Sequence, residues 1–386
     1  MFLTGQAVLA AKYEYTDPVS KVVYKYWPSR GVAQVKDGLC PEQGMTDTLE
    51  LYSGNPGVRG DIVILDKFTV DGQEYTVNRI GDCAFAFCGI TSVTIPSTVK
   101  TIDSYAFYKC KSLASVSFPD GLEYIHDLAF NCCDALSSVV LPEGLIQIAD
   151  AFPHCSGLKS VSLPSTLKYM YFNPFFDCPN LESITVDGAN ETFDSRDGCN
   201  AVIDTYSDIL IAGCGRTVIP STVKCIGFEA FGKCQFPDGK IVLPESIEGI
   251  DQGAFMGTNL KTITIPKGVT RINGGAFYDI PTLESIVSLS EDPCSIYPNG
   301  FWSIEGICMN PAVKLYIPAG TRDKYMERGW GNEFETIIEL VTDDIQDTAL
   351  KPGTHAGSLY DMQGRKIVNR KSSKGVYIQD GKKYVR

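Results

Sequence analysis

The sequence of 386 residues has no run of 18 apolar residues, so no segment is long enough to span a membrane as a helix. It has only three histidines, and none has an acid or a nucleophile at the spacing of a known catalytic motif. The motifs HExxH, GxSxG, GxxxxGK[ST] and GxGxxG are all missing. These absences argue against an enzyme, and a cryptic hydrolase stays an alternative for which the sequence offers no catalytic residue.

Signals for metals and for polyanionic partners are also missing. There is no Cys-x-x-Cys pair of the kind that binds zinc. Asp194, Asp197 and Asn200 hint at a calcium loop, but their spacing does not match a known calcium-binding frame. With 34 Lys and Arg against 46 Asp and Glu, the formal charge of -12 argues against nucleic acid or anionic membrane as the main partner. We therefore expect no metal, no cofactor and no nucleic acid.

A repeated pattern occupies the chain between about residue 80 and residue 290. Residues 83–102 read CAFAFCGITSVTIPSTVKTI, and near copies begin at Ser104 and Leu128. The repeat phenylalanines are 22 or 23 residues apart over five copies and recur later, at Phe85, Phe107, Phe130, Phe152, Phe175, Phe231, Phe255 and Phe277. A unit of this size cannot bury its own apolar face, whereas stacked units share one core. The repeat therefore predicts a solenoid.

Each unit carries the signal of one short strand. In Ser115-Val116-Ser117-Phe118 polar and apolar residues alternate, and Pro119 follows where no further backbone donor is needed. A proline recurs in that place in most units. We expect the strands to stack in parallel, one in each rung.

The pattern A-F-x-x-C-x-x-L-x-x-I-x-I-P-x-x-V-x-x-I resembles the BspA-like class of bacterial leucine-rich repeat, over about two thirds of the chain. The resemblance implies a mainly β solenoid, a right-handed horseshoe of about 22–23-residue rungs. It further implies a secreted or cell-surface protein, as in Gram-negative anaerobes and some mucosal protozoa, and binding rather than catalysis. Adhesion to host matrix proteins is known for some members of that class.

The N-terminal part departs from the repeat. Residues 1–11 are short, apolar and uncharged, which suits either the remnant of a signal peptide or an ordinary N-terminus. Residues 12–79 contain strand signals, among them 22–26, 61–65 and a hairpin at Asp71-Gly72. Because an open solenoid end exposes core and strand edges, we interpret 12–79 as a β-rich N-terminal cap, with a separate binding module as the alternative.

The array extends over residues 80–340 and is interrupted once. Residues 187–217 lengthen one unit and contain two strand signals, 200–204 and 208–212, which predict a hairpin insertion. A last strand is expected at 313–318 and a short helix at 320–326. Together with the apolar residues up to Leu340, these form an expected C-terminal cap, 313–340.

The C-terminal residues have a different composition. Residues 341–357 are polar and read as a linker, and 358–386 form a basic β-hairpin module around Asp380-Gly381. The last 22 residues carry a net charge of +7, so the first 364 carry -19. This module resembles short C-terminal modules that serve in sorting or surface attachment. Docking on the acidic solenoid and binding of an anionic polymer are the alternatives.

The fourteen cysteines fall into two groups. Six follow the repeat phenylalanine by three residues and are interpreted as buried thiols that fill the core, because parallel side chains on neighbouring rungs do not converge for a disulfide: Cys88, Cys110, Cys133, Cys155, Cys178 and Cys234. The others are irregular. Cys199 with Cys214, or Cys294 with Cys308, are candidate pairs in an oxidising compartment.

The outward positions of the repeat strands carry hydroxyl side chains. We expect them on the concave face, at Ser115, Ser117, Ser138, Ser160, Ser162, Thr185, Thr262 and Thr264. A solvated strand position explains any one of them, whereas the row favours an interface. The predicted partner is a protein, such as a host matrix or other surface protein. The alternative is a glycan, bound as part of a polysaccharide uptake system, with Tyr108, Tyr169 and Tyr171 as aromatic candidates.

Overall fold

The computed structural model describes residues 13–38, 54–296, 306–308 and 310–340, together with the backbone of two strands within 376–385. The chain divides into two compact units, Met1–Glu339 and Leu340–Arg386. The expected signal remnant at 1–11 and the expected linker at 341–357 lie outside the described residues. No helix in the described part is both long enough and apolar enough to cross a membrane.

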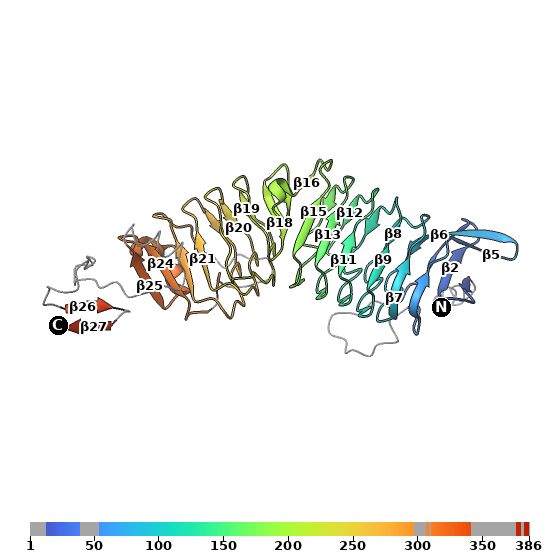
Figure 1. The fold of residues 1–386 in the computed structure, drawn as a ribbon, viewed down its shortest axis with the longest axis horizontal. Helices are drawn as coiled ribbons and strands as arrows, with labels where there is room; N and C mark the ends of the chain where they lie inside the picture. The colour runs from blue at the N-terminus through green and yellow to red at the C-terminus, as the bar shows by residue number, and fades with distance from the viewer. Residues whose placement is uncertain are drawn as a thin grey trace, which may run out of the picture. The chain divides into compact units, whose positions relative to one another are not determined.

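The first unit is a stack of short strands that lie side by side in chain order (Figure 1). The main strands of the rungs are β4 (Arg59–Val63), β7 (Gly89–Thr94), β9 (Ser115–Ser117), β11 (Ser138–Val140), β13 (Ser160–Leu163), β15 (Ser183–Val186), β21 (Thr262–Ile265), β23 (Ser285–Ser288) and β24 (Lys314–Pro318). They form the parallel sheets β4-β7-β9, β11-β13-β15 and β21-β23-β24. The expected parallel stacking is confirmed.

Most rungs contain a second strand, so the expectation of one strand per rung is wrong. These second strands are β6 (Gln73–Ile80), β8 (Thr101–Ile102), β10 (Tyr124–Ile125), β12 (Gln147–Ile148), β14 (Tyr169–Met170), β18 (Ile209–Gly213), β19 (Cys225–Ile226), β20 (Gly249–Ile250) and β22 (Arg271–Ile272). They pair in parallel as β6-β8-β10-β12-β14 and β18-β19-β20-β22. Most are two residues long, too short to show the alternation by which a strand is recognised in a sequence.

The core between the two sets of strands is built on the repeat phenylalanines. Neighbouring rings are nearly parallel, with centroids 4.9 Å apart for Phe107 and Phe130 and also for Phe130 and Phe152. The same stacking joins Phe231, Phe255 and Phe277. Each fully buried ring contributes about 1.5–3 kcal/mol to the free energy of unfolding, so the stacked rings account for a large part of the stability of the array.

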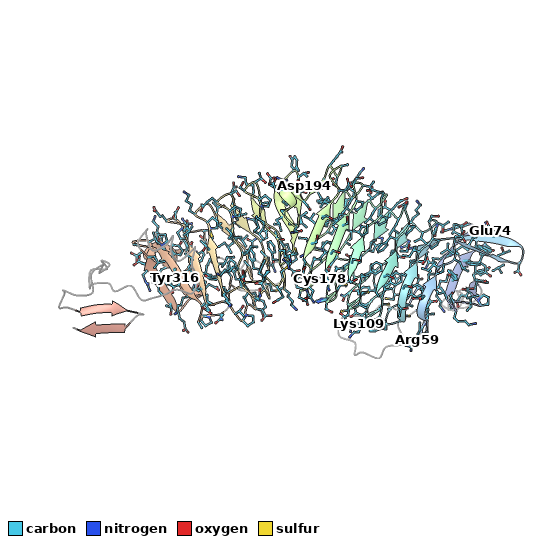
Figure 2. All side chains as sticks on the ribbon, in the orientation of Figure 1. Arg59, Glu74, Lys109, Cys178, Asp194 and Tyr316 are labelled. Carbon is cyan, nitrogen blue, oxygen red and sulfur yellow. The ribbon has the colours of Figure 1, made fainter. Side chains whose placement is uncertain are left out.

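The repeat cysteines lie beside this column of rings, and all six are buried. The Sγ of Cys110 donates to the carbonyl of Phe85, and the Sγ of Cys133 donates to that of Phe107, over 3.0 and 3.3 Å. Cys178, labelled in Figure 2, makes the same contact with Phe152. Among the thirteen cysteines in the described part there is no disulfide, and the candidate pairs Cys199–Cys214 and Cys294–Cys308 are not formed.

The N-terminal strands extend the array. β1 (Glu14–Thr16), β2 (Val23–Trp27) and β3 (Val32–Val35) are antiparallel, and β3 continues in parallel onto β6. β5 (Lys67–Val70) pairs antiparallel with β6, which confirms the hairpin expected at Asp71-Gly72. β4 and β6 pair in parallel with β7 and β8, so the layer before the first recognisable repeat already has the geometry of a rung.

The insertion forms the predicted hairpin. β16 (Phe193–Asp194), β17 (Ala201–Asp204) and β18 are antiparallel neighbours, and a single 3-10 turn, Arg196–Gly198, joins β16 to β17. Arg196 forms ion pairs with Asp194 and Asp208, which tie the end of β16 to the start of β18. The Asp194 carboxylate is therefore paired with a guanidinium. The described residues contain no group of three or more potential metal ligands. In Figure 2 Asp194 and Lys109 lie at opposite edges of the array.

The last part of the first unit contains the expected strand and helix. β24 is followed by the helix α1 (Arg322–Glu327), the 3-10 turn Trp330–Asn332 and β25 (Thr336–Leu340). Tyr325, Trp330 and Phe334 are buried against the last rungs, and Trp330 Nε1 donates to the Cys294 carbonyl over 2.9 Å. In the second unit, β26 (Val376–Gln379) and β27 (Lys382–Val385) form the antiparallel hairpin predicted around Asp380-Gly381.

Candidate functional site

The predicted binding residues lie on the main strands of five rungs. β9, β11, β13, β15 and β21 carry them, and apolar residues such as Val139 and Val161 alternate with them and point into the core. Ser115, Ser117, Ser138 and Thr185 are exposed, whereas the other four are half-buried: Ser160, Ser162, Thr262 and Thr264.

The strand register aligns these side chains in two rows. Ser138, Ser160 and Ser183 lie directly beside one another on three neighbouring strands. Ser162 lies beside Thr185 in the second row. Because neighbouring strands are about 4.8 Å apart, each row presents a hydroxyl at regular short intervals.

Sequence reasoning missed several members of the rows. Ser92 and Thr94 on β7 lie beside Ser115 and Ser117, and Ser285 on β23 lies beside Thr262. Ser285 follows its repeat phenylalanine by eight residues, as Ser115 does, so the repeat spacing could have found it, whereas Ser92 follows Phe85 by seven. We call the complete set the hydroxyl face: Ser92, Thr94, Ser115, Ser117, Ser138, Ser160, Ser162, Ser183, Thr185, Thr262, Thr264 and Ser285.

Two valines interrupt the second row. Val140 lies beside Ser162 and is 70% exposed, and Val63 on β4 lies beside Thr94 and is 62% exposed. Neither follows from the hydroxyl pattern of the sequence. These two exposed valines make the hydroxyl face partly apolar.

The hydroxyl face is free of charge over its first half. The strands β7, β9, β11, β13 and β15 contain no acidic or basic residue, although the chain carries a formal charge of -12. The first charge on this side is Asp61 on β4, which accepts hydrogen bonds from Ser92 and Thr91 over 2.7 Å each. These hydrogen bonds lower the pKa of Asp61, so it stays ionised at the end of the neutral surface.

Buried carboxyl groups lie elsewhere, where the rungs of Phe152 and Phe175 meet the rung of Phe231. Burial and the charge of Asp127 raise the pKa of Asp150 to about 6, and burial and the charge of Asp150 raise that of Glu229 to about 7. Asp150 Oδ1 is buried with no hydrogen-bond partner in the described part of the protein. Nearby, His154 and Lys233 both contact Asp177, over 2.8 and 3.2 Å. The sequence did not single out this cluster, because its members come from rungs 79 residues apart.

The three tyrosines proposed as aromatic candidates have different surroundings. Tyr108 packs edge-on against Phe87 and Tyr105, and the Lys109 ammonium lies 5.3 Å from its ring, so it belongs to a turn cluster. Tyr169 and Tyr171 instead lie at β14 and are 54% and 50% exposed.

Comparison with known proteins bears on the fold. The family model of the BspA type leucine rich repeat region matches six copies, over residues 78–197 and 214–305, which is more than half of the chain. The structure is similar to that of a leucine-rich repeat protein from Eubacterium ventriosum, with 18% identity, 85% of both chains covered and a TM-score of 0.55. It is also similar to the pneumococcal vaccine antigen PcpA, with 20% identity, 85% of this chain and 98% of that chain covered, and a TM-score of 0.50. Likeness at this identity shows the fold alone, and comparison with curated proteins found no match.

Proposed function

Because the chain belongs to the family of BspA-type leucine-rich repeat proteins, we propose that it is a non-enzymatic surface protein that binds another protein through its hydroxyl face. The observation that carries the proposal is the register of the rows, which presents uncharged hydroxyls on successive strands. A protein that repeats one surface chemistry over many rungs can contact an extended partner along its length.

The exposed valines favour a protein over a sugar chain on this face. Val63 and Val140 add apolar area among the hydroxyls, and no aromatic ring is present on β7, β9, β11, β13 or β15 on which a sugar ring could stack. Protein interfaces combine such apolar contacts with neutral hydrogen bonds and are depleted in charge at their centre.

A double substitution tests the proposal. In the variant Ser117→Arg with Ser162→Arg, two long charged side chains project from the hydroxyl face two rungs apart. Binding of the full chain to immobilised matrix proteins, namely fibronectin, fibrinogen, laminin and collagen, is measured by surface plasmon resonance. We expect one of them to bind the wild type and the variant to bind it at least about tenfold more weakly, because buried unpaired charge is costly in an interface.

The matched control adds the same two charges outside the face. Ser112 and Ser221 are exposed and lie in turns, so Ser112→Arg with Ser221→Arg should bind like the wild type. Equal binding by the two double variants would remove the hydroxyl face from the interface, and absence of binding to all four proteins would count against an adhesin of matrix proteins.

The finer features of the molecule belong to the same proposal. We propose a right-handed horseshoe in which the hydroxyl face is concave, with residues 12–79 and 313–340 covering the two ends of the array 80–340. Export to the cell surface, and attachment or sorting through the basic module 358–386, would place the face in contact with external partners. The buried Tyr24, Phe68 and Trp330 support the covering role of the two ends.

A further inference from the structure

The second strands of the rungs carry a cluster of aromatic side chains on a different sheet from the hydroxyl face. Tyr124, Gln147 and Tyr169 lie side by side on β10, β12 and β14. Two residues further along each rung, the backbone N–H groups of His126, Ala149 and Tyr171 donate to Ile102, Ile125 and Ile148 of the preceding rungs. These six positions, which we call the tyrosine site, are Tyr124, His126, Gln147, Ala149, Tyr169 and Tyr171.

The tyrosine site has rings on its two outer rungs and none on the middle one. The rings of Tyr124 and His126 are nearly parallel, at 13°, with centroids 6.4 Å apart. Two rungs away, Tyr169 and Tyr171 are about half exposed. The backbones of the outer rungs are about 10 Å apart. The side chain of Gln147 lies between Tyr124 and Tyr169, so the ring surface open to a ligand is the exposed part of Tyr169 and Tyr171.

The middle rung provides a low floor with one polar group. Ala149 is small and buried, and the half-buried Gln147 carries an amide that can both donate and accept. Among the described residues, no side-chain hydrogen bond is made by Gln147, Tyr169 or Tyr171, so their polar groups face solvent. Aromatic faces combined with open hydrogen-bonding groups match a ligand that has both apolar ring faces and hydroxyls.

The absence of charge restricts the ligand further. None of the six residues is a carboxylate, an ammonium or a guanidinium, in a chain that is otherwise 21% charged. A phosphate-bearing or sulfated ligand would meet no cation here, and a basic peptide would meet no carboxylate. An uncharged ligand is therefore the one that this surface complements.

We propose that the tyrosine site binds a pyranose unit of a neutral polysaccharide, stacked on Tyr169 and Tyr171 and hydrogen-bonded to Gln147. The aromatic surface continues past Tyr171 to Phe172, which is 61% exposed and whose ring lies 5.4 Å from that of Phe228. This continuation provides a contact for a second sugar unit. The site is independent of the proposed protein-binding function, because its residues lie on another sheet.

Affinity electrophoresis of the full chain tests this proposal. Native gels contain one neutral polysaccharide each, namely barley β-glucan, xylan, galactomannan or soluble starch, and a further gel contains the anionic polygalacturonate. We expect at least one neutral polysaccharide to retard the wild type and polygalacturonate not to retard it. Tyr169→Ala and Tyr171→Ala should each weaken the retardation at least about tenfold, since stacking on an aromatic ring contributes about 1–3 kcal/mol in comparable ring–ring contacts.

Two further variants make the test specific. Gln147→Ala keeps both tyrosines and removes the amide that hydrogen-bonds the sugar, so it should weaken retardation while the thermal unfolding midpoint stays near that of the wild type. Tyr206→Ala removes a ring that is 98% exposed and outside the site, and it should be retarded like the wild type.

The proposal is overturned if no neutral polysaccharide retards the wild type. It is also overturned if Tyr169→Ala and Tyr171→Ala migrate like the wild type in the gel that retards it. The variant Ser117→Arg with Ser162→Arg should be retarded like the wild type. Loss of retardation in that variant would assign sugar binding to the hydroxyl face instead.

Discussion

At the scale of single residues, the repeat phenylalanine and the repeat cysteine act as a pair. Phe130 stacks between Phe107 and Phe152, while the thiol three residues after it donates to the carbonyl of the preceding rung's phenylalanine. The thiol is small enough to fit beside the rings and still satisfies a carbonyl that the turn leaves open. A cysteine at this place therefore fills the core and hydrogen-bonds to it.

Burial should protect the repeat cysteines from alkylation. It raises the pKa of Cys110, Cys133 and Cys178 well above that of an exposed thiol, so little reactive thiolate is present at pH 8. Burial also raises the pKa of Cys294, to about 11. In native protein treated with iodoacetamide, we therefore expect mass spectrometry to find the half-buried Cys132 modified first among the cysteines that the structure describes. Modification of Cys110 or Cys133 as fast as Cys132 in the folded protein would contradict the buried ladder. Denatured protein, in which all should react, is the control.

The sequence was a good guide to residues that repeat and a poor one to residues that do not. Ser115 and Ser162 are on outward strand positions as expected, because alternation within a repeat strand places every second side chain outside. The valines Val63 and Val140 break the hydroxyl pattern, and their exposure depends on the register between strands. The repulsion between Asp150 and Glu229 depends on how the rungs before and after the insertion meet, which repeat spacing does not encode.

At the scale of elements, the insertion is the point where two regular stacks are joined. Phe231 packs over Gly213 of the inserted strand β18, which has no side chain where other rungs have the repeat ring. A Cβ atom on Gly213 would lie 2.1 Å from the Phe231 ring. The glycine thus allows the phenylalanine stack of the second half to begin directly at the hairpin.

Substitution of this glycine should destabilise the protein. For Gly213→Ala we expect a loss of about 1–3 kcal/mol, because the ring must move in a packed core. The loss is measured as a lower midpoint of urea unfolding. Gly188→Ala is the matched control, since a Cβ there meets nothing within 4 Å, and it should change stability by less than about 0.5 kcal/mol. Equal midpoints for the two variants would show that Gly213 does not set the junction.

The carboxyl pair at the same junction should make stability depend on pH. The pKa values of about 6 for Asp150 and about 7 for Glu229 lie above those of the unfolded chain, so the fold favours the protonated forms. Stability should therefore fall as the pH rises through 6 and 7, as ionisation forces charge into the junction and against the neighbouring Asp127.

We expect the unfolding temperature to be about 1–3 °C lower at pH 7.5 than at pH 5.5. Glu229→Gln should raise the unfolding temperature at pH 7.5 and reduce the difference between the two conditions. Glu245→Gln, at an exposed turn position, should leave the difference as it is in the wild type. An unfolding temperature that rises with pH over this range, or that responds equally to both substitutions, would contradict the assignment.

Elements were predictable where the pattern was long enough. The parallel main strands, the insertion hairpin, the helix near residue 322 and the C-terminal hairpin follow from alternation, spacing and turn residues. The second strands, such as β10 and β12, were missed because two residues show no period. β4 was read as part of a cap, since its own sequence lacks the repeat pattern that its pairing with β7 reveals.

At the scale of the whole chain, charge is distributed in a way that suits a binding protein. The acidic excess lies outside the main strands of the first rungs, which present only neutral side chains. An acidic protein repels others of its kind in solution, while a neutral face can still be desolvated at modest cost. The hydroxyl face and the tyrosine site offer two neutral surfaces of different chemistry on the same array.

The most direct test of the central claim is a scan of single arginine substitutions along the hydroxyl face. One substitution is placed in each of the rungs at Ser115, Ser138, Ser160, Thr185 and Thr262, and the affinity for the matrix protein that binds the full chain is measured for each. The account predicts that variants on consecutive strands lose affinity together, by about tenfold or more, while circular dichroism shows an unchanged fold. Undiminished binding by all five variants would show that the partner does not contact this face.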